Sequence, residues 1–291
     1  MIDTPARLTE MFQDPAVRHF ADNSVTLIKD LAAGDVDGVA ALYVGHIDID
    51  EPFHGRGVGT TGADIVRTWE PRNHGTVTDV RLEHYTQASG HAGAEIAVDY
   101  AMNDGRRVTS RMVVVSELDE EAGLFIRTRI YYRRAWIDGK QHPRQSIKEN
   151  THGEFVFQPI IQRYQETLRS GDLDEMVAVF SPDGYLDGHG ESRILKEGRG
   201  MGLYEGREDV RYCLKQMFDI EGHGDEDAAD SVSVGEFIDH RNMFDDGRTT
   251  ILEFVIIRPN DPDAPEQAGV SAYEIGDDGL LGAARIYDEG W

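Results

Sequence analysis

Two hydrophobic patterns follow each other along the chain, and the pair occurs twice. Over residues 15–32, apolar residues recur at intervals of three and four, which predicts an amphipathic helix that stops at Gly34. Beyond residue 73 the pattern changes to runs rich in Val, Ile, Tyr and Thr, separated by turns such as Asn103-Asp104-Gly105. This second pattern predicts antiparallel strands over residues 77–87, 94–102, 108–118 and 124–136.

Each half places the same small elements between its first helix and its strands. In the first half these are a short helix, a short strand over residues 47–51 and a helix that begins near Thr61. Helices followed by a meander of strands indicate an α+β fold, with a strongly bent antiparallel sheet around the helices. Such a cone is open at one end, which is a natural ligand site. In the second half, helices are expected over residues 155–169 and 206–218, and strands over 185–187, 231–244, 248–258, 269–275 and 280–287.

Short matching segments indicate that the chain is an internal duplication. Four segments of the first half are echoed in the same order in the second half, with the changing spacing that loop insertions produce. We therefore expect two cone-shaped α+β domains, residues 1–145 and 146–291; two unrelated α+β domains with common turns are the alternative. The matched segments begin at Ala33, Gly62, Asp104 and Arg129, and at Ser170, Gly206, Asp246 and Arg285.

Charge and composition narrow the classes of partner. The 291 residues include 29 Lys and Arg but 54 Asp and Glu, a net charge of −25, which repels phosphate backbones and anionic lipid. We therefore expect neither nucleic acid nor a membrane as partner. There is no apolar run near the ~20 residues that span a bilayer, no signal peptide at the N-terminus, and only one cysteine. These features predict a cytoplasmic protein.

The order of motifs resembles the nuclear transport factor 2-like superfamily, in particular its SnoaL-like polyketide cyclases and ketosteroid isomerases. The resemblance is carried by Gly34-Asp35, by Asp50-Glu51-Pro52 with its following glycine-rich loop, and by the closing segments Arg129–Tyr132 and Arg285–Asp288. It implies an enzyme without cofactor or metal that isomerises, cyclises or dehydrates a small apolar carbonyl or hydroxyl compound. The superfamily also contains non-catalytic ligand-binding and protein-interaction modules, which is the alternative. It further implies a sheet-to-sheet intramolecular pseudo-dimer, and a further homodimer stays open.

The resemblance points to particular catalytic residues. In isomerase-like relatives, a carboxylate just before a proline on the first strand is the general base; Glu51 precedes Pro52 there, with Asp50 beside it. Because side chains alternate along a strand, one of the two acids should point into the cone. An apolar interior raises the proton affinity of a carboxylate, which favours abstraction of a proton from carbon next to a carbonyl. The alternative is that both acids cap a loop. His54 and Tyr100 are the candidate assistants.

The isomerase pattern is incomplete in both halves. The helix tyrosine that holds the developing oxyanion in those relatives falls on Leu27 in the first half and on Tyr164 in the second. In the second half the base position is Gly188, between Asp187 and His189. Neither half has the full set, so a steroid isomerase proper is not expected.

The remaining candidates concern binding of a small apolar or amphipathic ligand. The glycine-rich segments 55–59 and 198–202 are expected to be mobile flaps, whose arginines could meet an anionic group; solvated loops are the alternative. There is no His-Glu-x-x-His motif, no pair of cysteines and no calcium loop, so no metal is expected. The candidate substrate-binding residues are Arg56, Trp69, Arg111, Tyr131, Tyr164, Asp187 and His189.

Overall fold

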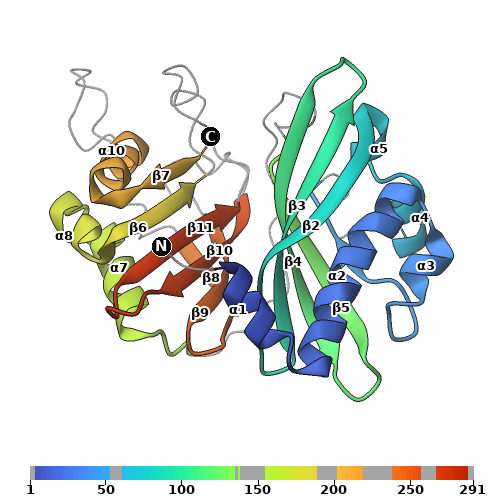
Figure 1. Cartoon of the computed structure of the whole chain (residues 1–291), viewed down its shortest axis with the longest axis horizontal. Helices are drawn as coiled ribbons and strands as arrows, with labels where there is room; N and C mark the ends of the chain where they lie inside the picture. Colours follow the sequence, from blue (N-terminus) through green and yellow to red (C-terminus); the bar gives the residue numbers. More distant parts are fainter. Residues whose placement is uncertain are drawn as a thin grey trace. The chain divides into compact units, whose positions relative to one another are not determined.

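The chain divides into two compact α+β units. The computed structural model describes residues 4–52, 61–134, 137, 155–188, 202–218, 238–256 and 267–287. The N-terminal unit comprises residues 3–145, and the C-terminal unit comprises residues 146–243 and 247–291. Their elements run from blue to green and from yellow to red, respectively, in Figure 1. The expected domain boundary, between residues 145 and 146, lies outside the described residues.

The helices of the N-terminal unit begin and end at residues with clear local causes. Pro15 opens the long helix, and the side chain of Asp14 accepts a hydrogen bond from Ala16 N. Gly34 ends it with a left-handed φ of 71°, a conformation that glycine adopts without steric cost. The helices are α1 (Thr4–Met11), α2 (Pro15–Ala33), α3 (Val36–Ala40), α4 (Gly62–Arg67) and α5 (Pro71–His74).

One mixed sheet completes this unit, in the order β1-β5-β4-β3-β2. Strand β1 runs parallel to β5, and the other neighbours are antiparallel. Register shifts between Val77 and Asp79 and between Leu82 and His84 bend β2, as β-bulges do. The strands are β1 (Ile49–Asp50), β2 (Gly75–Ala88), β3 (His91–Met102), β4 (Arg107–Asp119) and β5 (Leu124–Tyr132).

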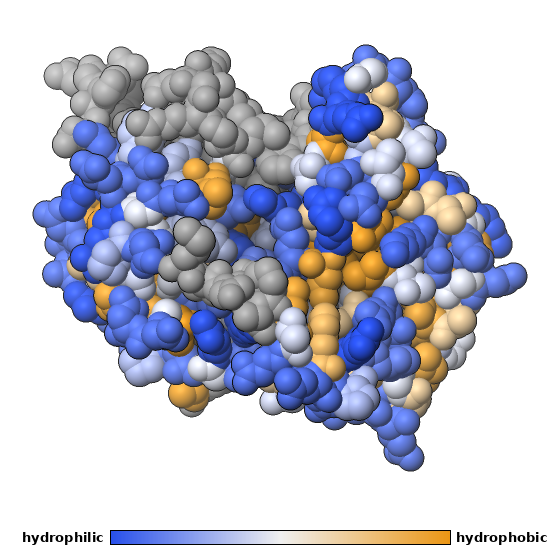
Figure 2. All heavy atoms as spheres, viewed as in Figure 1, coloured by the Kyte–Doolittle hydropathy of each residue, from blue (hydrophilic) through white to orange (hydrophobic). Residues whose placement is uncertain are grey.

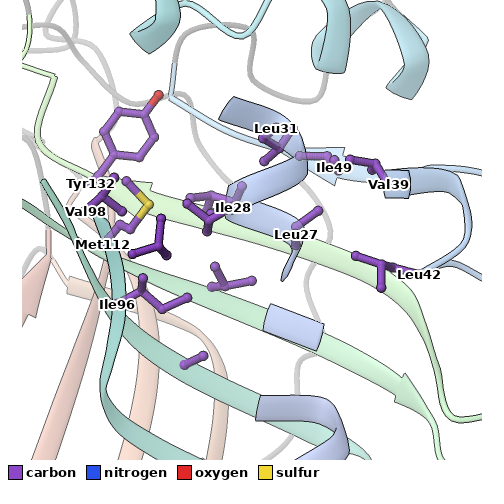
Figure 3. Close-up of a cluster of buried hydrophobic side chains, with 14 of the residues drawn as sticks. Leu27, Ile28, Leu31, Val39, Leu42, Ile49, Ile96, Val98, Met112 and Tyr132 are labelled. Carbon is purple, nitrogen blue, oxygen red and sulfur yellow. The ribbon is translucent and has the colours of Figure 1, made fainter. Parts of the chain in front are cut away.

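The core of the N-terminal unit lies between α2 and one face of this sheet. Leu27, Ile28 and Leu31 form the buried side of α2, as the sequence spacing predicts, and they face strand residues such as Ile96 (Figure 3). Tyr132 closes one end of this cluster, with its hydroxyl pointing away from the aliphatic side chains (Figure 3). An apolar interior with one polar end is therefore built into the unit.

The C-terminal unit repeats this plan in the sheet order β7-β6-β11-β10-β9-β8. Strand β6 pairs in parallel with β11, as β1 does with β5, and Gly171 ends its first helix with a left-handed φ of 71°. Helices α8 and α10 pack against β6. The elements are α7 (Pro159–Ser170), α8 (Leu173–Ala178), β6 (Phe180–Gly188), β7 (Leu203–Glu205), α10 (Gly206–Phe218), β8 (Ile238–Asp245), β9 (Thr249–Ile256), β10 (Gln267–Ile275) and β11 (Leu281–Tyr287).

The two sheets carry the same charged positions, which favours duplication over two unrelated domains. On the parallel pair, Asp50 lies beside Arg129 in the N-terminal unit, and Asp187 lies beside Arg285 in the C-terminal unit. All four side chains are buried. Because paired residues of neighbouring strands share a face, each aspartate and its arginine lie on the same side of the sheet.

A third charged position, a glutamate, is also shared by the two units. Arg129 Nη1 donates to Glu117 Oε1 over 2.8 Å, and Arg285 Nη1 donates to Glu274 Oε2 over 3.1 Å. Each glutamate stands two positions beyond the residue that pairs with its arginine, so the two arrangements match strand for strand. The α+β class and the paired organisation expected from the sequence are thus confirmed.

Several elements differ from the sequence expectation. The short helices α1 and α5 and the edge strand β7 were not expected, because each is too short to show a hydrophobic period. Strand β5 ends at Tyr132, not at residue 136, because the chain turns there and Ile137 N donates to Arg134 O. Among the described residues, no helix has both the length and the apolar character that crossing a bilayer requires.

Candidate functional site

A buried carboxylate marks the end of the first strand in the N-terminal unit. Glu51 follows β1 directly, and its side chain is 0% exposed. The hydroxyl of Tyr132, the last residue of β5, donates to Glu51 Oε2 over 2.9 Å. Since Tyr132 belongs to the hydrophobic cluster between α2 and the sheet, Glu51 reaches the polar end of that interior.

Asp50 has a different environment from Glu51. It lies beside Arg129 in the register, and Arg129 alternates with Ile130, a core residue, along β5. Asp50 and Arg129 therefore share the face of the sheet that is turned away from the core. Of the two acids singled out in the sequence, Glu51 is the one that contacts the interior.

Tyr132 is held in its protonated form. Its pKa lies well above the ordinary tyrosine value, first because of burial, and then because of the nearby charge of Glu51, the nearby Tyr100 and the hydrogen bond to Glu51. A tyrosine in this state donates its hydroxyl hydrogen throughout the physiological pH range. It fixes the position of Glu51 Oε2.

Three further polar groups are buried at the same end of the sheet. Tyr100 Oη, Trp69 Nε1 and Ser110 Oγ have no hydrogen-bond partner among the described residues. Tyr100 on β3 pairs with Val108, and Ser110 pairs with Val98, so both lie near the strand ends that hold Tyr132. Burial raises the pKa of Tyr100 above its usual value, so it too is a hydroxyl donor.

Trp69 is brought to this region by the chain connections around α5. It stands between α4 and α5, and its side chain is fully buried in the core cluster. The end of α5 is fixed to the end of β3, because Asn103 N donates to His74 O over 2.8 Å. Gly75, the first residue of β2, pairs with Met102, two residues beyond Tyr100. The candidate site therefore comprises Glu51, Tyr132, Tyr100, Trp69 and Ser110.

The structure does not bring two of the expected binding residues to this cluster. Arg111 and Tyr131 alternate with Met112 and Tyr132, which face the core, so both point to the opposite side of the sheet. Arg111 Nε contacts Glu83 Oε2 there, at 3.0 Å. The sequence identified the correct strands but not which side of each strand faces inward.

Other candidates lie outside the described residues. These are His54, Arg56 and His189, together with segments 55–59 and most of 198–202, which were expected to form flaps. Among the residues that the structure does describe, no group of three or more His, Cys, Asp or Glu could hold a metal ion.

In the C-terminal unit, the corresponding core contains packed aromatic side chains among aliphatic ones. Tyr164 on α7 packs edge-to-face against Phe180 and Tyr273, with ring centroids 5.6 and 5.7 Å apart. Gln165 Nε2 donates to Tyr273 Oη over 3.2 Å. Burial raises the pKa of Tyr164 well above its usual value. The tyrosine expected to hold an oxyanion is therefore a packed core residue.

The base position of the C-terminal unit has no carboxylate. Asp187 pairs with Arg285 as Asp50 pairs with Arg129, which places Gly188 where the N-terminal unit has Glu51. Asp187 lies on the same face as Arg285. Nearby, the buried Cys213 has its thiol pKa raised to about 12, by burial and then by Asp187, so it is not a nucleophile at neutral pH.

A separate groove lies between α2 and β2 of the N-terminal unit. Its volume is about 500 Å³ and its lining includes Lys29, Arg72 and Val77, but none of the residues around Glu51. Hydrophobic side chains gather in this part of the surface, flanked by hydrophilic ones (Figure 2). The groove shares no lining residue with the candidate site, although Val77 in its lining pairs with Tyr100.

Sequence reasoning missed Tyr132 and Ser110. Tyr132 adjoins Tyr131, and the side that each faces is decided by the parallel pairing of β5 with β1, which no local pattern reveals. The one signal in the sequence is the pair of neighbouring tyrosines itself, one of which must face inward. Ser110 has no distinguishing signal.

Comparisons with known proteins give structural likenesses only. No protein-family model and no curated protein matches the chain. Similar solved structures include a protein of unknown function with a cystatin-like fold from Xanthomonas campestris, which is 17% identical, has a TM-score of 0.32, and covers 44% of this chain and 87% of its own. An NTF2-like protein of unknown function from Cytophaga hutchinsonii is 13% identical, with a TM-score of 0.30, and covers 47% and 94%.

A third similar structure is a putative polyketide cyclase from Sinorhizobium meliloti, 14% identical with a TM-score of 0.29, covering 44% of this chain and 92% of its own. Because the TM-scores lie below 0.5, the fold assignment rests on the element order and strand registers described above, and the likenesses carry no argument about the reaction.

Proposed function

We propose that the N-terminal unit is a cofactor-independent acid–base enzyme acting on a small, largely apolar carbonyl or hydroxyl compound. The observation that carries this proposal is the buried carboxylate of Glu51, hydrogen-bonded to Tyr132 at the polar end of an apolar interior. Buried ionisable groups are costly to keep in a folded protein and are concentrated at functional sites.

The proposed reaction begins with proton transfer from carbon. Glu51 takes a proton from the carbon next to a carbonyl, and the electron pair of the broken C–H bond moves onto the carbonyl oxygen, which gives an enolate. Return of the proton from Glu51 to another carbon is an isomerisation. Attack of the enolate carbon on a second carbonyl closes a ring, and the alkoxide formed takes the proton back from Glu51. In a dehydration, the electron pair of the enolate expels the hydroxyl group of the neighbouring carbon, which takes the proton from Glu51 and leaves as water. Tyr132 keeps Glu51 Oε2 in place during these steps.

The C-terminal unit supports the alternative, a role without catalysis. Its base position is Gly188, and Tyr164 and Tyr273 occupy its interior. We therefore assign the chemistry to the N-terminal unit and propose that the C-terminal unit is a scaffold or interaction module. A duplicated chain needs only one working copy, so the second can diverge.

Hydrogen–deuterium exchange at carbon tests the proposal without knowledge of the natural substrate. Apolar ketones such as 2-tetralone and cyclohex-3-enone are incubated with the protein in D₂O, and loss of the α-proton signal is followed by NMR. The wild-type protein is expected to accelerate exchange, and Glu51→Gln is expected to slow it by about 10²–10⁴-fold, the usual contribution of a general base. Glutamine keeps an acceptor oxygen for Tyr132, so the fold is retained.

Asp50→Asn is the matched control, since it changes the neighbouring acid that faces away from the core. This variant is expected to keep most of the exchange activity. Equal loss of activity in both variants, full activity in Glu51→Gln, or no acceleration of any ketone by the wild-type protein would each contradict the proposal.

A further inference from the structure

We propose that Tyr100 and Trp69 form the subsite that receives the carbonyl oxygen of the substrate. The inference rests on the proposed function, and it names the substrate class more narrowly: a compound whose oxygen can accept a hydrogen bond from both donors, such as a ketone or enone. The observation behind it is the pair of buried donors, Tyr100 Oη and Trp69 Nε1, that have no hydrogen-bond partner among the described residues.

Such pairs are uncommon in folded proteins. The large majority of buried side-chain polar atoms are hydrogen-bonded, and each exception needs an explanation. Both side chains are at most 1% exposed, so bulk water does not satisfy them. Tyr100 lies at the end of the sheet where Tyr132 contacts Glu51, and it is close enough to Tyr132 to affect its pKa; Trp69 belongs to the same core cluster and directly precedes the segment that leads into this end of the sheet. A ligand atom there would meet both donors near the carboxylate.

The chemistry of the two donors selects the ligand atom. An indole N–H can only donate, and a buried tyrosine with a raised pKa keeps its hydrogen and donates as well. An atom that accepts two hydrogen bonds, as a carbonyl oxygen with its two lone pairs does, would satisfy both donors. A phenol such as 2-naphthol presents two lone pairs in the same way, and its hydroxyl hydrogen can point toward a carboxylate, so it imitates the enol form of a ketone.

The same arrangement would assist the proposed reaction. When Glu51 removes the α-proton, negative charge develops on the carbonyl oxygen, and fixed donors in a water-excluded site stabilise that charge more than the neutral ground state. Ser110, the third buried hydroxyl at this end of the sheet, can donate or accept and so does not distinguish between ligand classes.

A binding experiment with two probes of nearly equal size tests the subsite. The probes are 2-naphthol, which carries one oxygen on an apolar planar frame, and naphthalene, which carries none; their fluorescence reports binding. The wild-type protein is expected to prefer 2-naphthol by on the order of tenfold or more, the effect of one to two hydrogen bonds. Tyr100→Phe and Trp69→Phe are each expected to lower this preference by on the order of tenfold, with the affinity for naphthalene changed less.

The affinity for naphthalene shows whether Trp69→Phe has lost apolar packing. The variant Glu51→Gln separates this inference from the proposed function. In Glu51→Gln the preference for 2-naphthol is expected to persist, because the donors are intact, while exchange activity is lost. If the wild-type protein shows no preference for 2-naphthol, or if both phenylalanine variants keep it, the subsite is wrong. In that case the effect of Glu51→Gln on exchange still decides the proposed function on its own.

Discussion

Tyr132→Phe is expected to lower the free energy of unfolding by about 1.5–3 kcal/mol, the usual worth of a hydrogen bond to a charged group. The substitution removes one oxygen and leaves the ring in place, so the apolar packing of the cluster is kept. What is lost is the 2.9 Å bond to Glu51 Oε2, in a site where water does not replace it. Urea denaturation followed by circular dichroism measures the change.

Tyr100→Phe is the matched control for this prediction. It makes the same chemical change in the same cluster, but the hydroxyl that it removes has no hydrogen-bond partner among the described residues. We expect its stability to equal or exceed that of the wild-type protein, because an unsatisfied buried hydroxyl is costly. If the two variants lose the same free energy, the contact between Tyr132 and Glu51 is not the source of stabilisation.

The alkaline pH dependence follows from the same contact. The folded protein raises the pKa of Tyr132 above the unfolded value of about 10, so the folded state binds this proton more tightly. The stabilisation is therefore complete below about pH 10 and is lost as the pH rises above that value. In Tyr132→Phe the fall in stability above about pH 10 should be shallower, and the remainder comes from the other buried tyrosines whose pKa is raised, namely Tyr43, Tyr85, Tyr100, Tyr164 and Tyr273.

Arg285→Met is expected to have the largest effect on stability, a loss of about 3–5 kcal/mol, because it breaks a buried ion pair and leaves the buried Glu274 facing a more distant counter-charge, Arg248 Nε at 3.6 Å. Arg285 is 3% exposed and Glu274 is 1% exposed, and the nitrogen and oxygen lie 3.1 Å apart. The same arginine nitrogen also donates to the hydroxyl of Tyr185 over 3.0 Å. Thermal unfolding monitored by calorimetry measures the loss.

Two further variants separate the cause of this loss. The double variant Arg285→Met with Glu274→Leu removes both charges, and it should recover much of the stability, since a buried pair is often replaceable by apolar residues of similar size. Arg129→Met should cost less than Arg285→Met, because its partner Glu117 is 29% exposed and can be solvated. A double variant no better than Arg285→Met would refute the ion-pair explanation.

Much of the fold could be predicted because local signals agree with the tertiary structure. The helix over residues 206–218 and the stop of α2 at Gly34 are both found as the sequence indicates, and Gly105 adopts the left-handed φ of 89° that a tight turn uses. Glycine and proline act within a few residues, so their effect can be read directly. The short elements α1 and α5 depend on packing against the sheet, which a local pattern does not record.

The candidate site could be predicted only in part. Glu51 follows from its place before a proline at the end of the first strand, but its partner Tyr132 lies 81 positions away in the chain. The inward side of β5 is decided by its register with β1, and a shift of one residue would have turned Tyr131 inward instead. Non-local strand pairing, not residue type, therefore decides which side chains meet.

Covalent labelling with 2-bromoacetophenone, an apolar ketone, tests most directly whether Glu51 is the reactive carboxylate of this protein. A carboxylate oxygen near the bound ketone attacks the CH₂ carbon, bromide leaves, and an ester forms. Mass spectrometry of the digested protein identifies the residue that carries this ester. We predict that Glu51 is labelled, that excess 2-naphthol slows the labelling, and that the labelled protein loses exchange activity. An ester on Asp50 or in the C-terminal unit, with Glu51 unmodified, would contradict the account.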